Sequence, residues 1–377
     1  MVYMNNAATG YPKFPSALKA MTESLEIGAL SANRDSVITE SVCSRMFDLR
    51  NRIGDMLHAT EPHEIVFTPS DTIALNTLMQ GIGLGDGDVL LIDSVGHNAV
   101  SRPAMYLAKS RGVVLVSVGS LRELGEALSE HGDKVKAAVF SHGSNVTGDA
   151  IDINTIGRVL DSHKIPFILD VAQTIGLYPI DVEAAHVSAA AFAGHKGLNG
   201  PQGTGGFYIR KSFKVDPILF GGNGADSMSL NPDIVYPDSF EVGTPAMHDL
   251  IGLHQSLLEI EAIGADAYAE NIRAIAQFAH DELIKIPNVI VYGRNKKDLP
   301  VVSFNVYGKT CKDVGMILSQ KGGIICRTGV HCASLAMHKL DVMDDFGGTV
   351  RVSFGWKSTK EEVNILVECV KEIAKNA

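Results

Sequence analysis

The stretch AGHKGLNGPQGTGG at residues 193–206 decides how the fold is inferred from this sequence. It places Lys196 in a loop of glycines directly after the apolar run that ends at Ala193, and a second apolar run begins at Gly205. Glycines exclude large side chains and allow a backbone to approach a ligand closely. Most lysines are solvated surface residues, but a lysine of that kind requires no such loop. We therefore treat Lys196 as a candidate active-site residue.

Short apolar runs and helical patterns alternate on either side of this loop. The apolar runs predict buried strands at residues 64–68, 88–93, 112–118, 136–141, 166–170, 187–193 and 205–209. The patterns between them predict helices at roughly residues 71–82, 98–111, 120–130 and 152–163. This alternation predicts an α/β fold in which helices cover both faces of a mostly parallel central sheet.

The pattern changes after about residue 249. We expect helices at residues 251–263 and 265–286, and strands at residues 289–292, 301–306, 323–327 and 349–353. A last helix is predicted to begin at Ser358, with Glu361 completing a capping box. The sequence therefore predicts a large domain at residues 16–250 and a smaller α+β domain made of residues 251–377 with residues 1–15.

The composition is that of an ordinary globular protein. Its 377 residues are 45% hydrophobic and 20% charged, and 33 basic against 43 acidic residues give a net charge of −10. Such an acidic chain is poorly suited to bind nucleic acid or an anionic membrane surface. The apolar stretches are too short to span a bilayer, and no secretory signal is visible. Five cysteines without a C-x-x-C pair fit the reducing cytoplasm.

A candidate acid lies at the end of another predicted strand. Asp170 follows the apolar residues 167–169, and ligands of open α/β sheets bind at the carboxyl ends of the strands. A carboxylate at that position can hold the protonated pyridine nitrogen of pyridoxal phosphate, which makes the ring an electron sink. The alternative interpretation is an aspartate that caps a helix or lies in a loop.

A candidate phosphate site lies where a predicted strand runs into a helix, at Ser70, Asp71 and Thr72. Free backbone N–H groups and hydroxyl side chains at a helix N-terminus bind phosphate. The same residue types are also ordinary helix caps, so both interpretations stay open.

Several motifs together resemble one protein family. In chain order they are Thr72, His97, Asn145, Asp170-x-x-Gln173, Gly194-His195-Lys196, Gly243-Thr244-Pro245 and Arg327-Thr328-Gly329-Val330-His331-Cys332. Over almost the whole chain, from Asn6 to Ser353, the sequence resembles the class V aminotransferases, and within them the cysteine desulfurases and selenocysteine lyases. The resemblance implies a fold-type I pyridoxal-phosphate transferase whose large domain binds the cofactor.

The resemblance also implies how the cofactor is held. Lys196 would bind pyridoxal phosphate covalently and later move protons, Asp170 would pair with the ring nitrogen, and His97 would stack on the ring. The remaining cofactor contacts fall on Ser70, Asp71, Thr72, Gln173, His195 and Thr244. Gln173 would bond the ring hydroxyl, Thr72 and His195 would bind the phosphate, and Thr244 would reach the phosphate of a neighbouring subunit. The resemblance therefore implies a homodimer.

On the substrate side, the resemblance assigns the amino-acid carboxylate to Asn145 and Arg351, with Arg327 nearby. Cys332 would be the nucleophile that receives sulfur as a persulfide, and it completes the predicted catalytic set of Lys196, Asp170 and His97. A neighbouring cation, His331 or Arg327, would favour its thiolate form. A sulfur-acceptor protein is a further implied partner.

The implied reaction converts L-cysteine to L-alanine and leaves a persulfide on Cys332. A selenocysteine lyase acting on L-selenocysteine stays open, as does another pyridoxal-phosphate-dependent C–S β-lyase or an aminotransferase, because the motifs specify the substrate less closely than the fold. A cofactor-binding scaffold with weak activity is a third hypothesis. The joint presence of Lys196, Asp170 and Cys332 argues against it.

The sequence departs from the family pattern at several positions. Ala193 replaces a hydroxyl that contacts the phosphate, Gly96 replaces an acid before the stacking histidine, and Asn5 replaces an aspartate. Val37 and Val330 stand where histidine is found in relatives.

The remaining cysteines carry no catalytic motif. Cys43 and Cys369 fall in helical patterns and are predicted to be packing residues. Cys326 closes an apolar run and is expected in the core.

Overall fold

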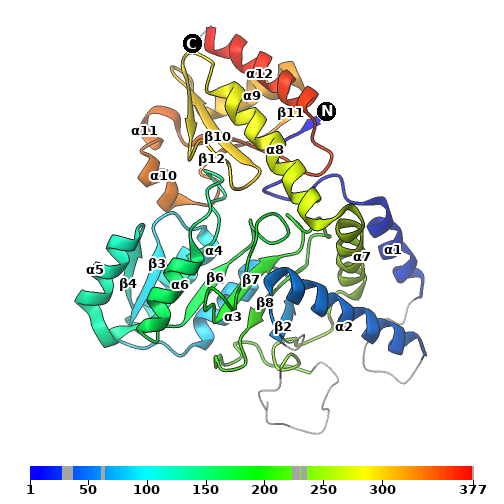
Figure 1. Cartoon of the computed structure of the whole chain (residues 1–377), viewed down its shortest axis with the longest axis vertical. Helices are drawn as coiled ribbons and strands as arrows, with labels where there is room; N and C mark the ends of the chain where they lie inside the picture. The colour runs from blue at the N-terminus through cyan, green and yellow to red at the C-terminus, as the bar shows by residue number, and fades with distance from the viewer. Residues whose placement is uncertain (28–36, 61–63, 223–229, 231–235, 376–377) are drawn as a thin grey trace.

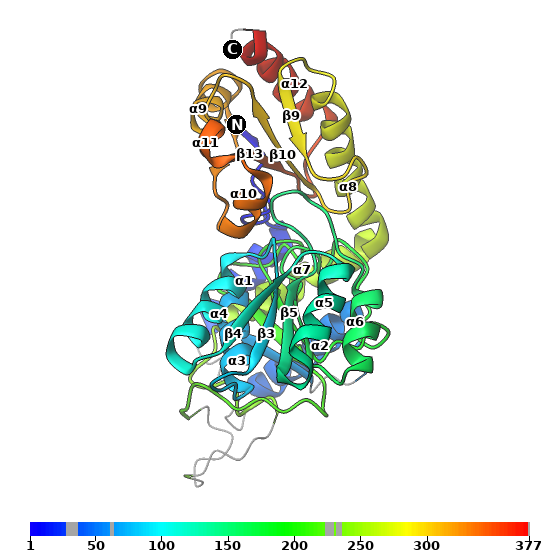
Figure 2. The same cartoon turned by 90° about the vertical axis from the view of Figure 1, so that its left-hand side faces the viewer.

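The computed structural model describes residues 1–27, 37–60, 64–222, 230 and 236–375. Figure 1 shows two regions stacked along the long axis of the molecule, a lower one built around a large sheet and an upper one around a smaller sheet. The N-terminal strand β1 and the C-terminal helix α12 both belong to the upper region (Figures 1 and 2).

The lower region contains a seven-stranded sheet with strand order β2-β8-β7-β6-β5-β3-β4. Its strands are β2 (Ile65–Thr68), β3 (Val89–Asp93), β4 (Val114–Val118), β5 (Val135–Ser141), β6 (Phe167–Asp170), β7 (Ala189–Ala193) and β8 (Gly205–Ile209). All neighbours pair in parallel except β8, which is antiparallel to both β2 and β7. The predicted α/β class with a mostly parallel sheet is therefore confirmed.

Helices cover both faces of this sheet. They are α1 (Pro15–Ile27), α2 (Val37–Leu57), α3 (Asp71–Gly81), α4 (Asn98–Arg111), α5 (Leu121–His131), α6 (Ile153–Ser162) and α7 (Met247–Ile263). Alternate residues of one strand enter different cores: Ile65 packs with α2, and Val66 packs with α3 and α4. A strand buried on both faces needs apolar residues throughout, which explains the continuous apolar runs in the sequence.

The upper region contains an antiparallel four-stranded sheet of order β12-β13-β10-β9 and a parallel pair, β1 with β11. Its elements are β1 (Val2–Tyr3), α8 (Ala265–Leu283), β9 (Val289–Tyr292), β10 (Val301–Val306), α9 (Cys311–Gly322), β11 (Ile324–Ile325), β12 (Arg327–Gly329), α10 (Ser334–Leu340), α11 (Met343–Phe346), β13 (Thr349–Ser353) and α12 (Lys360–Lys375). The single strand predicted at residues 323–327 is wrong: the chain divides at Cys326, and its two halves join different sheets.

The chain passes from the lower to the upper region between helices α7 and α8, close to the predicted domain boundary. Helix α7 packs against α1 and α2, whereas α8 packs against α12 and β10. Two long helices in sequence thus contact different regions, separated by Gly264. The division after residue 250 stays a prediction.

Two local predictions are corrected by the structure. The cap of α12 is formed by Thr359 and Glu362, whose side chains each accept the other's backbone N–H at 3.2 Å, and Ser358 instead accepts the N–H of Gly355. Cys43 is exposed rather than packed, because it lies beside the buried stripe of α2 instead of within it. Cys326 and Cys369 pack against the core as predicted. Within the described ranges, no helix combines the length and apolar character needed to cross a membrane.

Candidate active site

The carboxyl edge of the large sheet gathers polar residues from neighbouring strands. Asp93, Ser141 and Asp170 are the last residues of β3, β5 and β6, which lie next to one another in the sheet. Ser141 and Asp170 are register partners. Because parallel strands end at the same edge, these three side chains share one site with the loop that follows β7.

Lys196 lies in that loop, and the loop can form only with glycines. A Cβ on Gly194 would lie 2.3 Å from Thr204 Oγ1, and one on Gly197 would lie 2.5 Å from the carbonyl oxygen of Ile175. Both separations are shorter than side chains tolerate. The glycine-rich sequence therefore reflects close packing of this loop around the lysine.

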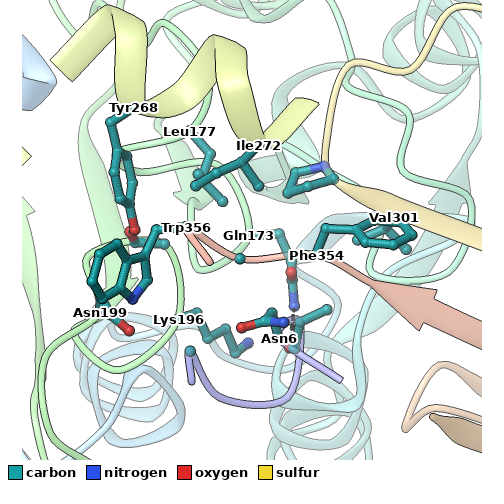
Figure 3. Close-up of a pocket in the computed structure, with 15 residues that line it drawn as sticks. Asn6, Gln173, Leu177, Lys196, Asn199, Tyr268, Ile272, Val301, Phe354 and Trp356 are labelled. Carbon is teal, nitrogen blue, oxygen red and sulfur yellow. Dashed lines mark hydrogen bonds between the residues drawn. The ribbon is translucent and has the colours of Figure 1, made fainter. Parts of the chain in front are cut away.

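Two open spaces are lined by predicted site residues. One is a cavity of about 20 Å³ that Lys196 shares with Asn6, Gln173 and Trp356 (Figure 3), which has room for about one water molecule. The other is a groove of about 510 Å³ that is lined among others by Thr72, His97 and Cys332, and not by Lys196. A ligand larger than water therefore has room on the His97 side.

The charged groups around Lys196 shift its pKa in opposite directions. Burial lowers the pKa of Lys196, the carboxyl groups of Asp71 and Asp170 counteract that effect, and the guanidinium groups of Arg351 and Arg327 add to it. Burial raises the pKa of Asp170, and Lys196 counteracts it. The Asp170 carboxylate accepts the Ala172 N–H at 2.9 Å, and the Ser141 hydroxyl lies 3.5 Å from its other oxygen.

The three residues at the start of α3 have different environments. Ser70 is the N-cap, with its side-chain oxygen accepting the Ile73 N–H at 3.3 Å. Asp71 is buried, its Oδ1 has no hydrogen-bond partner, and burial together with Asp170 raises its pKa well above the usual range. Thr72 is exposed in the groove. Ser70 thus serves as a cap, and Asp71 and Thr72 keep side-chain atoms available.

His97 is fixed by its place at the start of α4. Its Nδ1 accepts the Ala99 N–H at 3.1 Å, which leaves the proton of the neutral ring on Nε2. Burial and then Lys196 lower the pKa of His97 to about 4, so the ring is neutral at physiological pH.

His195 and Gln173 flank the lysine. Burial lowers the pKa of His195 to about 4, and its buried Nδ1 has no hydrogen-bond partner. The Gln173 amide donates to the carbonyl oxygen of Ala7 at 3.1 Å. Ala193, immediately before the loop, supplies no hydroxyl.

Two arginines from the upper region face the same site. Arg327 and Arg351 are register partners on β12 and β13, so their like charges lie on neighbouring positions of one sheet face. Arg351 is fully buried: it donates to the carbonyl oxygen of Asn145 at 2.9 Å and to Asn5 Oδ1 at 3.2 Å, and its Nε has no partner. Burial and then Arg327 lower the pKa of Arg351 to about 9. An anion between the two arginines would relieve this repulsion.

Cys332 lies beside this pair. Arg327 Nη2 donates to its Sγ at 3.0 Å, and the side chain is exposed. The backbone is pinned to the lower region, because the Cys332 carbonyl accepts the Asn98 N–H at 2.7 Å and the His331 carbonyl accepts the Asn145 amide at 2.8 Å. Both His331 and Cys332 adopt left-handed φ values, 55° and 57°, which is rare for side chains of this kind.

His331 does not act as a cation for the thiol. It is buried and hydrogen-bonds Thr349, and burial lowers its pKa to about 3. The sequence-based hypothesis that His331 favours the thiolate is therefore wrong, and Arg327 is the cation in contact with Cys332.

Thr244 is separate from the residues around Lys196. It is exposed and lines a groove of about 330 Å³ together with Thr68 and Pro69, which directly precede Ser70. It therefore lies on the outer side of the α3 N-terminus.

The described residues fit an anionic aldehyde cofactor. Buried polar atoms without partners occur on Asp71, His195 and Arg351, all within electrostatic reach of Lys196, whose depressed pKa suits covalent chemistry with an aldehyde. Asp170 supplies an acid at the same strand edge. Fold and site together define an α/β enzyme that uses pyridoxal phosphate.

Comparison with known proteins names the family. The family model described as aminotransferase class-V matches residues 2–366, and the chain belongs to this family. It is 29% identical to a probable cysteine desulfurase of Methanothermobacter thermautotrophicus, over 99% of this chain and 94% of that protein. It is 32% identical to one of Halalkalibacterium halodurans, over 85% of this chain and 80% of that protein. The apo structure of a cysteine desulfurase from Thermococcus onnurineus superposes with a TM-score of 0.90 at 28% identity, covering 100% of this chain and 95% of that one.

Sequence reasoning missed two polar residues of the site. Asn5 departs from the family pattern, and its side chain accepts a hydrogen bond from Arg351. Asp93 was not singled out, although it ends a predicted strand as Asp170 does. Applying the strand-end rule to every predicted strand would have found Asp93.

Proposed function

We propose that this protein is a pyridoxal-phosphate-dependent cysteine desulfurase that converts L-cysteine to L-alanine and receives the sulfur as a persulfide on Cys332. The observation that carries the proposal is the 3.0 Å contact between Arg327 and Cys332 Sγ, on a loop that is hydrogen-bonded to Asn98 and Asn145. The relatives named as cysteine desulfurases support it.

The cofactor would be held by residues of the lower region. Lys196 would bind it covalently, Asp170 would hold a proton at its ring nitrogen, and His97 would stack on its ring. The remaining contacts would come from Thr72, Asp71, Ser70, Gln173 and His195. When bound, pyridoxal phosphate would supply an electron sink that stabilises negative charge at the substrate Cα.

Lys196 would also move the substrate proton. Its lowered pKa increases the share of neutral amine at physiological pH, and a neutral Nζ can accept a proton from Cα. The lysine lies beside a small cavity that Trp356 and Tyr268 also line (Figure 3).

The substrate carboxylate would lie between Arg327 and Arg351. Their like charges share one sheet face, and the unpartnered Nε of Arg351 is a donor available to an anion. Asn145 would help to position it, because its carbonyl and amide groups already fix Arg351 and the Cys332 loop.

The sulfur step balances without an external oxidant. The Cys332 sulfur forms an S–S bond with the substrate sulfur while the substrate Cβ–S bond breaks. The electron pair of that bond stays on Cβ, which takes one proton and becomes the methyl group of alanine. The proton lost from the Cys332 thiol balances the one gained by carbon, so carbon is reduced and the two sulfurs are oxidised.

Three further features belong to the proposal. A homodimer would bring Thr244 of one subunit to the phosphate of the other, since Thr244 is exposed beside the α3 N-terminus. A sulfur-acceptor protein would then take the persulfide from the exposed Cys332. The cytoplasm, where thiols stay reduced, would be the compartment.

The test is product analysis with L-cysteine in the absence of a thiol reductant. We expect one alanine per persulfide and an added sulfur mass on Cys332, and the variant Cys332→Ala should lose both while the cofactor still binds. Cys43→Ala is the matched control, because Cys43 is also exposed. Undiminished alanine release by Cys332→Ala, without added sulfur in the parent, would instead indicate a β-lyase. Alanine release only from L-selenocysteine would indicate a selenocysteine lyase.

A further inference from the structure

A row of three polar side chains crosses the carboxyl edge of the large sheet. Asp93, Ser141 and Asp170 end the adjacent strands β3, β5 and β6 and are only 5%, 7% and 6% exposed. The Ser141 N–H donates to Asp93 Oδ2, and the Ser141 hydroxyl lies 3.5 Å from Asp170 Oδ2. The same hydroxyl also lowers the pKa of Asp93. Ser141 therefore links two buried acids that lie on either side of it.

We propose that Asp93 is a positioning residue that acts on Asp170 through the Ser141 hydroxyl and so sets how strongly Asp170 holds a proton at the ring nitrogen of the cofactor. This inference rests on the proposed function, in which Asp170 faces that nitrogen. It gives a role to a buried acid that the proposed reaction does not otherwise use.

The space for Asp93 is created by Gly96. A Cβ on Gly96 would lie 2.0 Å from Asp93 Oδ1, so any larger residue at position 96 would displace the carboxyl group. Gly96 stands where the sequence departs from the acid typical of the family, directly before His97. The site therefore has an acid at position 93, at the end of the strand, and the absence of a side chain at Gly96 leaves room for its carboxyl group.

The surroundings of Asp93 favour its neutral form. No ion pair of Asp93 occurs in the described part of the chain, and its Oδ1 has no hydrogen-bond partner of ordinary geometry. The groups that face it are Ser141, the Gly96 peptide N–H and the like charge of Asp170. Burial, which outweighs the Ser141 hydrogen bonds, raises the pKa of Asp93 to about 7.

The two protonation states of Asp93 affect Asp170 in opposite ways. A neutral Asp93 can donate to the Ser141 oxygen, which leaves the Ser141 hydroxyl proton for Asp170 and weakens the hold of Asp170 on a further proton. An ionised Asp93 competes for the same hydroxyl proton and adds a negative charge, so Asp170 and the ring nitrogen hold their proton more strongly. The proton at the ring nitrogen should therefore respond to pH near 7.

The experiment uses full-length protein loaded with pyridoxal phosphate that carries ¹⁵N at its ring nitrogen. The ¹⁵N chemical shift is followed from pH 5.5 to 8.5, without substrate, for the parent, Asp93→Asn and Gly96→Ala. Asp133→Asn is the control, because Asp133 is an exposed residue just before the opposite end of the Ser141 strand. We expect a transition near pH 7 in the parent and control, and its loss in both Asp93→Asn and Gly96→Ala.

The possible outcomes distinguish the role of Asp93 from the assignment of the cofactor to Lys196. An unchanged transition in Asp93→Asn or in Gly96→Ala, or a parent without any transition in this range, would overturn the role of Asp93 and leave the proposed function intact. Failure of the parent to form a borohydride-trappable adduct on Lys196 would overturn the cofactor assignment, and the role of Asp93 with it.

Discussion

Replacing Asp93 by asparagine should change how the stability of the folded protein depends on pH. Asparagine has the same shape, can still accept the Ser141 N–H, and cannot ionise. Burial raises the pKa of Asp93 from 3.8 to about 7 in the folded chain, so between these values the folded state binds a proton that the unfolded state has lost. The stability contributed by the neutral acid is complete below about pH 4 and is lost as the pH rises to about 7.

The size of this effect follows from the shift. One pKa unit corresponds to about 1.4 kcal/mol, so a shift of about three units gives an upper estimate of ~4 kcal/mol. We therefore expect Asp93→Asn to be equal to the parent or less stable near pH 4, since its amide lacks a second partner. Near pH 8 it should be more stable by up to ~4 kcal/mol. The stability of Asp93→Asn relative to the parent should therefore rise between pH 4 and pH 8.

The assay is urea unfolding of the cofactor-free protein at pH 4, 5, 6, 7 and 8, followed by circular dichroism and by the fluorescence of Trp356, the single tryptophan. Asp133→Asn should track the parent at every pH, because Asp133 is exposed. A constant difference between Asp93→Asn and the parent across this range would refute the reasoning, because it would mean that Asp93 carries the same charge in both states.

Four further predictions concern the site. Lys196→Ala should lose the borohydride-trappable cofactor adduct and at least about 10²-fold in activity, which mass spectrometry and kinetics would detect; an adduct on another lysine would contradict the assignment. Asp170→Asn should still bind the cofactor but lower kcat for L-cysteine steeply, because it removes the buried negative charge, and a rate near that of the parent would show that another group holds the ring nitrogen. Arg351→Lys should raise KM for L-cysteine about 10–100-fold, because the guanidinium hydrogen bonds to Asn145 and Asn5 are lost. The cofactor spectrum should stay unchanged, and an unaltered KM would exclude Arg351 from the carboxylate site. Cys332 should alkylate faster than Cys43, which is also exposed, and its alkylation should slow in Arg327→Gln, as measured by peptide mass spectrometry; an unchanged rate in Arg327→Gln would show that Arg327 does not activate it.

The large sheet and the lysine loop can be predicted from the sequence alone. Each predicted strand of the large sheet was found within a few residues, because strands buried on both faces must be apolar throughout and the helices between them have a different period. The loop around Lys196 was recognisable because close packing permits only glycine at Gly194 and Gly197. These are local constraints, and local constraints leave a pattern in the sequence.

Which polar residues share the site, and in what charge state, depends on how distant segments come together in the folded chain. Arg351 alternates with apolar residues, which is equally typical of a solvent-facing strand position, yet it is fully buried because Asn145 and Asn5 from distant segments enclose it. His331 and Arg327 both flank Cys332 in the sequence, but only Arg327 contacts the sulfur, since burial directs His331 to Thr349. Burial and hydrogen bonding depend on which strand ends lie side by side. That arrangement is set by the order of strands in the sheet, which differs from their order in the chain.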